Sequence, residues 1–185
     1  RSMEQYAPLS EDTWQAFIAI TKITTLAKAS LIVRLGECPT TYSYIYRGLV
    51  RGYTCNDKGQ EYNKVFFNEG MFPGAMTALL TQSPSKFALE TIEETELVDI
   101  NFAGFRQLLL EKDDLKLFQI HYLEQNWLLE KDQREIELVQ QDASLRYEKF
   151  VKQHADLIER IPQYHIASHL GITPTQLSRI RKNRD

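Results

Sequence analysis

Hydrophobic positions are spaced in three ways along the chain, and each spacing predicts a different kind of element. Near the start, Trp14, Phe17 and Ile18 recur at helical intervals behind Ser10, a residue type that caps helices. Between about residues 23 and 100, short β-rich runs such as SLIVRL, YNKVFF and TELVDI alternate with turn signals such as NDKG (56–59). Runs this short and evenly spaced predict a sandwich or small barrel of about eight strands.

A long helix is predicted over residues 114–140, where apolar side chains recur at three- and four-residue steps. The stripe that carries this prediction consists of Leu115, Phe118, Tyr122, Gln125 and Leu129, and it continues to Ile136 and Val139. Such a stripe can pack against its own domain or form a two-stranded coiled coil with a second copy. The length of the helix and its polar opposite face favour the homodimer.

The helical pattern breaks at residues 140–144, where Asp142 or Ser144 could cap a new helix. That helix would carry Leu145, Tyr147 and Phe150. The break predicts three parts: a sensing domain over 3–113, a dimerisation helix over 114–141 and a terminal domain over 142–185.

The stretch from Pro162 to Lys182 predicts a helix-turn-helix. Gly171 supplies a tight turn, and Thr173 and Pro174 suit the cap and first turn of the second helix. Apolar or small residues occupy every position where the two helices would meet: Ile166, Ala167, Leu170, Ile172, Leu177 and Ile180. A helical hairpin used only for packing would explain these positions equally well.

The outward positions of the second helix favour DNA binding over packing. They are Thr173, Thr175, Gln176, Ser178, Arg179, Arg181 and Lys182. Gln and Arg can each make two hydrogen bonds to a base edge, and Arg181 and Lys182 suit phosphates. His165 and His169 have no third metal ligand nearby, and we expect them on the outer face of the first helix, in contact with phosphate or solvent.

Charge is distributed unevenly along the chain. The net charge is −3, but residues 144–185 contain eight Lys or Arg and four acids, which leaves −7 for the rest. A basic end on an acidic body is typical of a protein whose end alone contacts phosphate. Two cysteines are too few for a disulfide framework, and no signal peptide or membrane span is present, so we expect a cytoplasmic protein without a membrane partner.

Two segments carry a resemblance to a known family: GLVRGYTCNDKGQEYNKVFFNEGMFPG, which looks like its β-roll core, and SLRYEKFVKQHADLIERIPQYHIASHLGITPTQLSRIRK, which looks like its DNA-binding part. The family is the Crp/Fnr family of transcription regulators, and the resemblance covers nearly the whole chain. The second segment is especially similar to a short-tailed branch found in Bacteroidetes. The resemblance implies an α+β fold: an N-terminal helix, an eight-stranded β-roll (a double-stranded β-helix of the cyclic-nucleotide-binding type), a long dimerisation helix and a C-terminal helix-turn-helix domain. It further implies a homodimer that binds a near-palindromic double-stranded DNA operator, with RNA polymerase as a partner.

The resemblance also marks an effector pocket, in which this chain departs from the family. Gly74, Ala75 and Met76 replace the Gly-Glu-Leu turn that holds the ribose, and Ser85 and Lys86 replace the Arg-Ser/Thr pair that holds the phosphate. Lysine lacks the two-pronged guanidinium that selects phosphate, so we expect neither cyclic AMP nor cyclic GMP, and no cofactor. The pocket either takes an unidentified small effector or has become packing.

Two further expectations follow from the comparison with the family. Some members read DNA with Arg-Glu at the start of the recognition helix and a later Arg; here Pro174 and Thr175 replace the pair, and Arg179 alone matches. An altered operator, with Arg179 on a guanine, is therefore expected. Related β-rolls can be metal enzymes, but all four histidines follow the last β-rich run, so no catalytic or metal-binding residue is expected.

Overall fold

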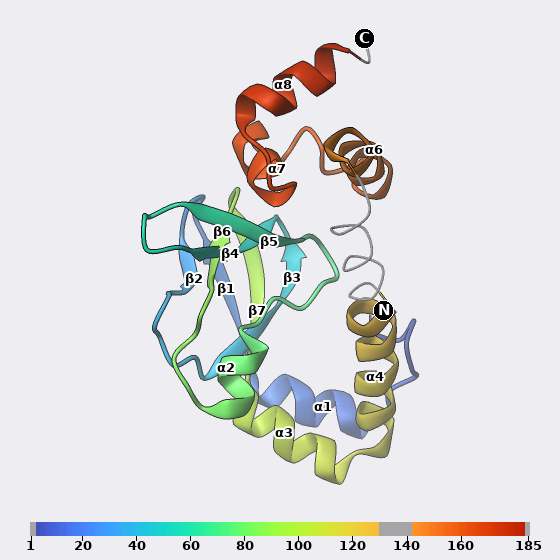
Figure 1. Ribbon diagram of the computed structural model, residues 1–185. Coiled ribbons are helices and arrows are strands. Elements are labelled where there is room, and N and C mark those ends of the chain that lie inside the picture. The colour runs from blue at the N-terminus through green and yellow to red at the C-terminus, as the bar shows by residue number, and fades with distance from the viewer. Residues whose placement is uncertain (1–2, 130–141, 184–185) are drawn as a thin grey trace.

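The computed structural model describes residues 3–129 and 142–183 as an α+β fold (Figure 1). Two antiparallel sheets lie against each other. The first has the order β1 (Thr21–Leu26), β7 (Thr95–Asn101), β3 (Thr41–Arg47). The second has the order β2 (Leu31–Val33), β6 (Ala88–Thr91), β4 (Val50–Cys55), β5 (Glu61–Phe67). Between the sheets lies an apolar core that includes Ile45, Val50, Leu89 and Leu97.

The sequence predicted about eight strands, whereas the described residues contain seven. Residues 70–73 run beside β3, where a further strand would lie: the amide of Ile45 donates to Met71 O at 3.0 Å and that of Ser43 to Pro73 O at 2.9 Å. Pro73 has no N–H to donate in return, so this segment does not extend into a ladder.

We call the two packed sheets together the β-roll. Helices cover the end of the β-roll that lies farther from the terminal helices. They are α1 (Glu11–Ala19), α2 (Met76–Thr81), α3 (Phe102–Glu111) and α4 (Asp113–Leu123), which continues into a π-helical turn, η1 (Glu124–Leu128). Ser10 caps α1 as predicted, by accepting from the amide of Thr13. Asp114 fixes α4 to the same point, because its carboxylate accepts from the Ser10 amide and the Thr13 hydroxyl at 2.8 Å each.

Leu115, Phe118 and Tyr122, three of the residues expected in a dimer interface, are buried in the chain's own core beside Phe72. These three side chains therefore pack against their own domain, which was the alternative interpretation of the stripe. Gln125 and Leu129 lie further along and are exposed. Residues 130–141 of the predicted long helix, with Ile136 and Val139, lie outside the described residues.

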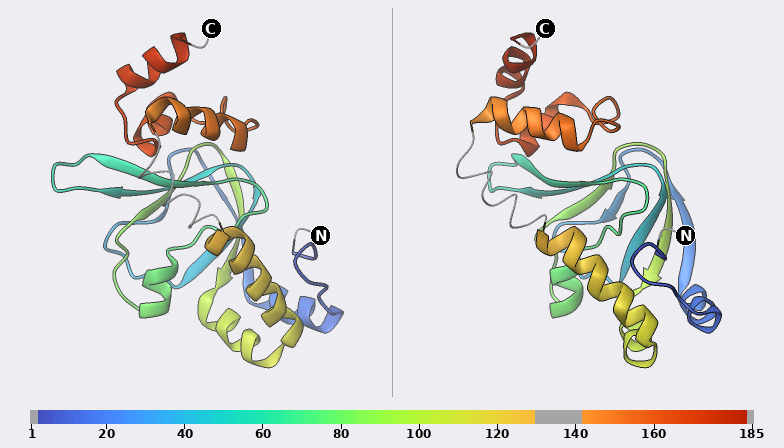
Figure 2. Two further views of the ribbon diagram at one scale, coloured as in Figure 1. Left: turned by 45° about the vertical axis from the view of Figure 1, so that its right-hand side comes forward. Right: turned by 90° about the vertical axis from the view of Figure 1, so that its right-hand side faces the viewer.

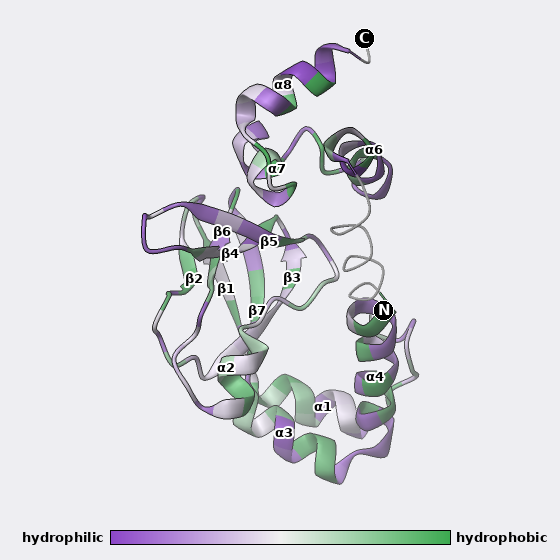
Figure 3. Ribbon diagram, viewed as in Figure 1, coloured by the Kyte–Doolittle hydropathy of each residue, from purple (hydrophilic) through white to green (hydrophobic). Residues whose placement is uncertain are grey.

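The opposite face of α4 was predicted to be polar, but beside its charged residues it also carries exposed apolar side chains. Leu117 and Ile120 are 45% and 47% exposed, and Leu128, in η1, follows about two turns later at 59%. Figure 3 shows the resulting alternation of green and purple along α4. We name these three side chains, Leu117, Ile120 and Leu128, the outer stripe.

The terminal helices are α6 (Ala143–Gln153), α7 (Gln163–His169) and α8 (Pro174–Lys182). Asp142 caps α6 by accepting from the amide of Leu145 at 2.9 Å, as one of the two predicted caps would. The three helices lie on the outer side of the second sheet, and both views of Figure 2 show α8 farthest from the β-roll. Within the described ranges, no helix is long and apolar enough to cross a membrane.

Candidate nucleic-acid interface

Helix α8 begins with a complete capping box. The Thr173 hydroxyl accepts from the amide of Gln176 at 3.2 Å, and the Gln176 side-chain oxygen accepts from the amide of Thr173 at 2.9 Å. Pro174 follows at the first helical position, where no amide hydrogen is needed. The cap therefore uses Thr173 and Gln176, two of the residues predicted to contact DNA, to fix the start of the helix.

The two faces of α8 differ in the way that the sequence predicted. Leu177 is buried and Ile180 half-buried against α6 and α7. The seven outward positions are all exposed: Thr173, Thr175, Gln176, Ser178, Arg179, Arg181 and Lys182. Residues 173–183 contain no acid, and Figure 3 shows α8 as largely hydrophilic. The helix therefore presents a positive polar surface away from the rest of the chain.

The turn between α7 and α8 holds the two helices at close range. Gly171 has a φ of +69°, a conformation that L side chains rarely adopt, and Ala167 is fully buried where the helices meet. Arg146, from α6, donates to the carbonyl of Leu170 at 3.0 Å and so satisfies the end of α7. α6, α7 and α8 thus form one packed unit.

The other face of α7 lies on the edge of the second sheet. Strand β5 is an edge strand, so every second residue turns unpaired backbone groups outward. The Ser168 hydroxyl accepts from the amide of Asn63 at 3.1 Å and donates to the carbonyl of Glu61 at 2.8 Å. His169 Nδ1 donates to the carbonyl of Asn63 at 3.0 Å. The helix therefore replaces the missing neighbouring strand.

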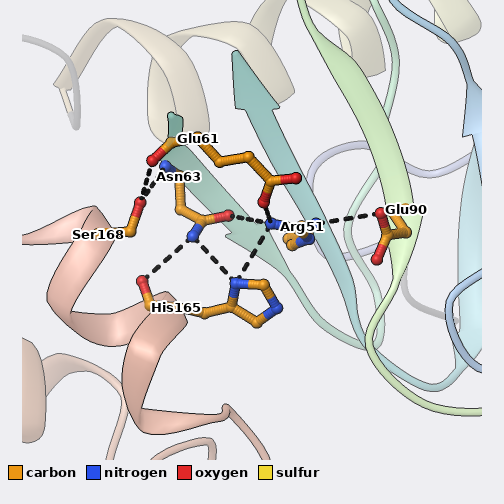
Figure 4. Close-up of polar contacts among 6 residues, drawn as sticks. All are labelled: Arg51, Glu61, Asn63, Glu90, His165 and Ser168. Atoms are coloured by element: carbon orange, nitrogen blue, oxygen red, sulfur yellow. Dashed lines mark hydrogen bonds and ion pairs between the residues drawn. The ribbon is translucent and has the colours of Figure 1, made fainter. Parts of the chain in front are cut away.

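Arg51 lies beneath this contact, with its side chain only 5% exposed (Figure 4). Its guanidinium donates to Glu61 at 2.5 Å and to Glu90 at 3.1 Å, and it stacks 3.9 Å from the ring centre of Tyr53. It also lies 3.2 Å from Nδ1 of His165. Burial opposes the charge of Arg51, but the two carboxylates outweigh it and raise the pKa of the guanidinium.

The expectation that His165 and His169 face solvent or phosphate was wrong for His165, which is buried, and His169 contacts the sheet. Burial and the nearby charge of Arg51 lower the pKa of His165 to about 4, against a smaller opposing effect of Glu61. The neutral ring accepts at Nδ1 from both Arg51 and the Asn63 amide group. Helical spacing alone could not show this, because the partners come from β4 and β5.

A second ionic contact holds the far end of the interface. Arg160 donates to Glu69 at 2.8 Å and to Glu93 at 2.5 Å. Burial would raise the pKa of Glu69, but hydrogen bonds from Arg160 and the Gly48 amide lower it to about 2. Between the two ionic contacts, Leu49, Phe66 and Ile92 of the β-roll join the apolar core of the terminal helices.

In the described part of the chain, the residues expected in an effector pocket do not gather around one cavity. Ala75 is fully buried in the β-roll core, and the Ser85 hydroxyl donates to the carbonyl of Phe87 at 2.6 Å. Lys86 is exposed. Gly74 is close-packed, since a Cβ at this position would lie 2.8 Å from that of Tyr42. Met76 borders a space of about 20 Å³, roughly the room for one water molecule.

Aromatic rings fill the region between α4 and the first sheet. Phe72 lies 5.9 Å from Phe118 and 5.1 Å from Tyr122, and 6.2 Å from Tyr42. Burial raises the pKa of Tyr42 well above its usual value. None of the four histidines lies on a strand, and the described residues contain no group of three His, Cys, Asp or Glu that could hold a metal ion.

The sequence matches no protein-family model and no curated protein, but solved structures share its fold. CLP of Xanthomonas campestris, a c-di-GMP-responsive global regulator, has a TM-score of 0.75 at 18% identity, covering 94% of this chain and 91% of its own. FixK2 of Bradyrhizobium japonicum has a TM-score of 0.75 at 15% sequence identity, and the match covers 89% of this chain and 84% of FixK2. The catabolite activator protein of Thermus thermophilus has a TM-score of 0.56 at 17% identity, and the match covers 99% of this chain and 86% of that protein. These proteins are Crp/Fnr regulators, and the chain therefore has the Crp/Fnr fold that its sequence resembles.

Proposed function

We propose that this protein is a sequence-specific regulator of transcription that binds double-stranded DNA through α8. The observation that carries this proposal is the outward face of α8, which is exposed, basic and free of acids across residues 173–183. Arg179 reaches a base edge in the major groove, and Gln176, whose side-chain oxygen closes the cap, offers its NH2 group; Arg181 and Lys182 contact phosphates. The Crp/Fnr fold of the neighbours supports the same function.

In this proposal the protein acts as a homodimer. Two recognition helices in successive major grooves of one DNA face must be about 34 Å apart, and a shared α4 region can set that distance. The outer stripe supports this arrangement, because it leaves apolar side chains such as Leu117 and Ile120 exposed in a single chain. We place the sensing domain at 3–113, the dimerisation helix at 114–141 and the DNA-binding domain at 142–185, with a cytoplasmic setting and RNA polymerase as a partner.

DNA selection from a random duplex pool tests this function. We expect enrichment of a near-palindromic site whose affinity falls steeply between 50 and 200 mM salt, because each neutralised phosphate releases counterions. A matched chain with Arg179, Arg181 and Lys182 all replaced by Gln should enrich no sequence. Affinity that does not change with salt, or equal enrichment by both chains, would contradict the proposal.

The filled β-roll favours one form of this regulator over another. An effector other than cyclic AMP was one expectation, and packing without a ligand was the other. Because Tyr42, Phe72, Phe118 and Tyr122 occupy the region beside α4, we propose a regulator whose β-roll binds no cyclic nucleotide there. CLP responds to c-di-GMP, so the test includes it. Cyclic AMP, cyclic GMP and c-di-GMP at millimolar concentration should leave the thermal unfolding midpoint unchanged, and a reproducible rise with any of them would favour the effector-binding form.

A further inference from the structure

Helix α7 divides its surface between two partners. His165, Ser168 and His169, spaced three and four residues apart, meet the edge of the second sheet. Ile166 and Ala167 are buried against the other terminal helices. One helix thus lies between the β-roll and α8, so the direction of α8 relative to the β-roll depends on how α7 rests on β5.

The contact combines interactions that are difficult to break one at a time. Arg51 is buried, and its charge is balanced only while Glu61 and Glu90 stay in place. If α7 left the sheet, the amide of Asn63 and the carbonyl of Glu61 would lose Ser168, and the apolar side chain of Phe66 would meet water. These groups lie side by side, so they form or break together.

The contact leaves the surface of α8 free. Figures 1 and 2 show α8 on the side of α7 away from the sheets, and the seven outward side chains are exposed while α7 is docked. A duplex approaching these side chains would not have to displace the β-roll of the same chain. The contact therefore fixes the direction of α8 without covering it.

We propose that the packing of α7 on the β5 edge, with Arg51 beneath it and Arg160 at its end, is an orienting joint that presents α8 to DNA in one direction. This inference rests on the proposed function. In a dimer, two joints would fix both recognition helices before binding, so that little orientational entropy is lost when a two-part site is bound. Without the joints, each helix-turn-helix would still bind its half-site, but the pair would no longer favour one spacing.

The test measures the affinity of the Arg160→Gln and Ser168→Ala variants, and of the wild-type protein, for duplexes that the wild-type protein selects. Arg160 is partly exposed, so its substitution should leave the chain folded. Arg47→Gln is the matched control, because it removes a similar ion pair, with Glu96, in which no terminal helix takes part. We expect each joint variant to bind the selected two-part duplex roughly tenfold more weakly. Affinity for a single half-site should stay within about twofold, and the penalty for shifting the half-sites by five base pairs should shrink.

Other outcomes separate the joint from the proposed function. Tighter binding by the joint variants would mean that the contact blocks DNA, and equal losses on whole and half sites would mean that the reading surface itself is damaged; either result would overturn the joint. Affinities equal to those of the Arg47→Gln control would do the same. A wild-type chain that selects no duplex would overturn the proposed function instead. Amide hydrogen exchange gives a readout without DNA: the amide of Asn63 should exchange faster in Ser168→Ala and at an unchanged rate in Arg47→Gln.

Discussion

Gly48 shows how strongly one position can depend on the absence of a side chain. Its φ is +118°, and a Cβ there would lie 2.5 Å from the Thr95 hydroxyl oxygen and 2.7 Å from the Thr95 Cα. Gly59 also has a positive φ, +77°, but nothing lies within 4 Å of its missing Cβ. The two glycines therefore separate backbone strain from steric overlap.

Gly48→Ala should lower the free energy of unfolding by about 3 kcal/mol, because strain and overlap add. Gly59→Ala should cost only about 1 kcal/mol, since strain alone remains. Urea unfolding of both variants measures the difference. Equal losses in the free energy of unfolding would show that Thr95 moves to make room for the new Cβ, so that no steric overlap remains.

Arg179→Ala should reduce the preference at one base pair by about 1 to 3 kcal/mol, because a two-pronged contact to guanine is lost. Lys182→Ala is the control: it should weaken all sequences alike and reduce the salt dependence by about one released counterion. Titration of duplexes that differ at single positions distinguishes them. A uniform loss for Arg179→Ala would place Arg179 on the DNA backbone.

At the scale of elements, α7 carries a histidine whose protonation opposes docking. The charged groups of its polar cluster are Arg51 from β4, Glu61 from β5 and Glu90 from β6. Asn63 donates to the histidine ring, and the Tyr164 ring lies tilted against it at 4.2 Å between centroids. The pKa of His165 is about 4 in the folded chain and near 6.5 when unfolded, so between these values the unfolded chain binds more protons. Stability from this group is full above pH 6.5 and decreases as the pH falls towards 4.

His165→Asn, which keeps an acceptor near Nδ1 but cannot be protonated, should remove this pH dependence. We expect wild-type stability to fall by up to about 3 kcal/mol between pH 7 and pH 4.5, and the variant to fall by clearly less. Urea unfolding at pH 7, 5.5 and 4.5 measures both slopes and stays above most of the range in which Glu69, with a pKa of about 2, takes up its proton. Parallel slopes would rule out His165 as the source.

Local signals predicted individual elements well, and they failed where the partner comes from another part of the chain. The cap at Thr173, the turn at Gly171 and the cap at Asp142 each depend on neighbours within a few residues. The first two were predicted, and Asp142 was one of two predicted caps. The burial of His165 depends on β5 being an edge strand, which no spacing in the sequence reveals. Likewise, an apolar stripe through Phe118 shows that a face is covered, but not whether the same chain covers it.

For the whole molecule, these two faces of α4 have different consequences. The inner face is already part of the β-roll core, so among the described residues of α4 and η1 the outer stripe is the apolar surface left for a partner helix. Leu117 and Ile120 are three residues apart, which is the spacing of a helix-pairing seam. A charge placed there should separate the copies without disturbing the fold of either.

Ile120→Glu tests this directly, because two-fold symmetry would bring the two new carboxylates close together in an apolar seam. Ile120 is 47% exposed in one chain, so the variant should fold and sediment as a monomer at concentrations where the wild type is a dimer. Leu110→Glu is the matched control, since Leu110 is 73% exposed on α3 and should leave the dimer intact. Loss of the dimer should lower affinity for a two-part site roughly 100-fold while half-site affinity is retained, because the second half-site is no longer tethered. A dimeric Ile120→Glu chain would show that the two copies meet through another surface. The two α8 helices would then have to be brought to the spacing of successive major grooves by that other interface.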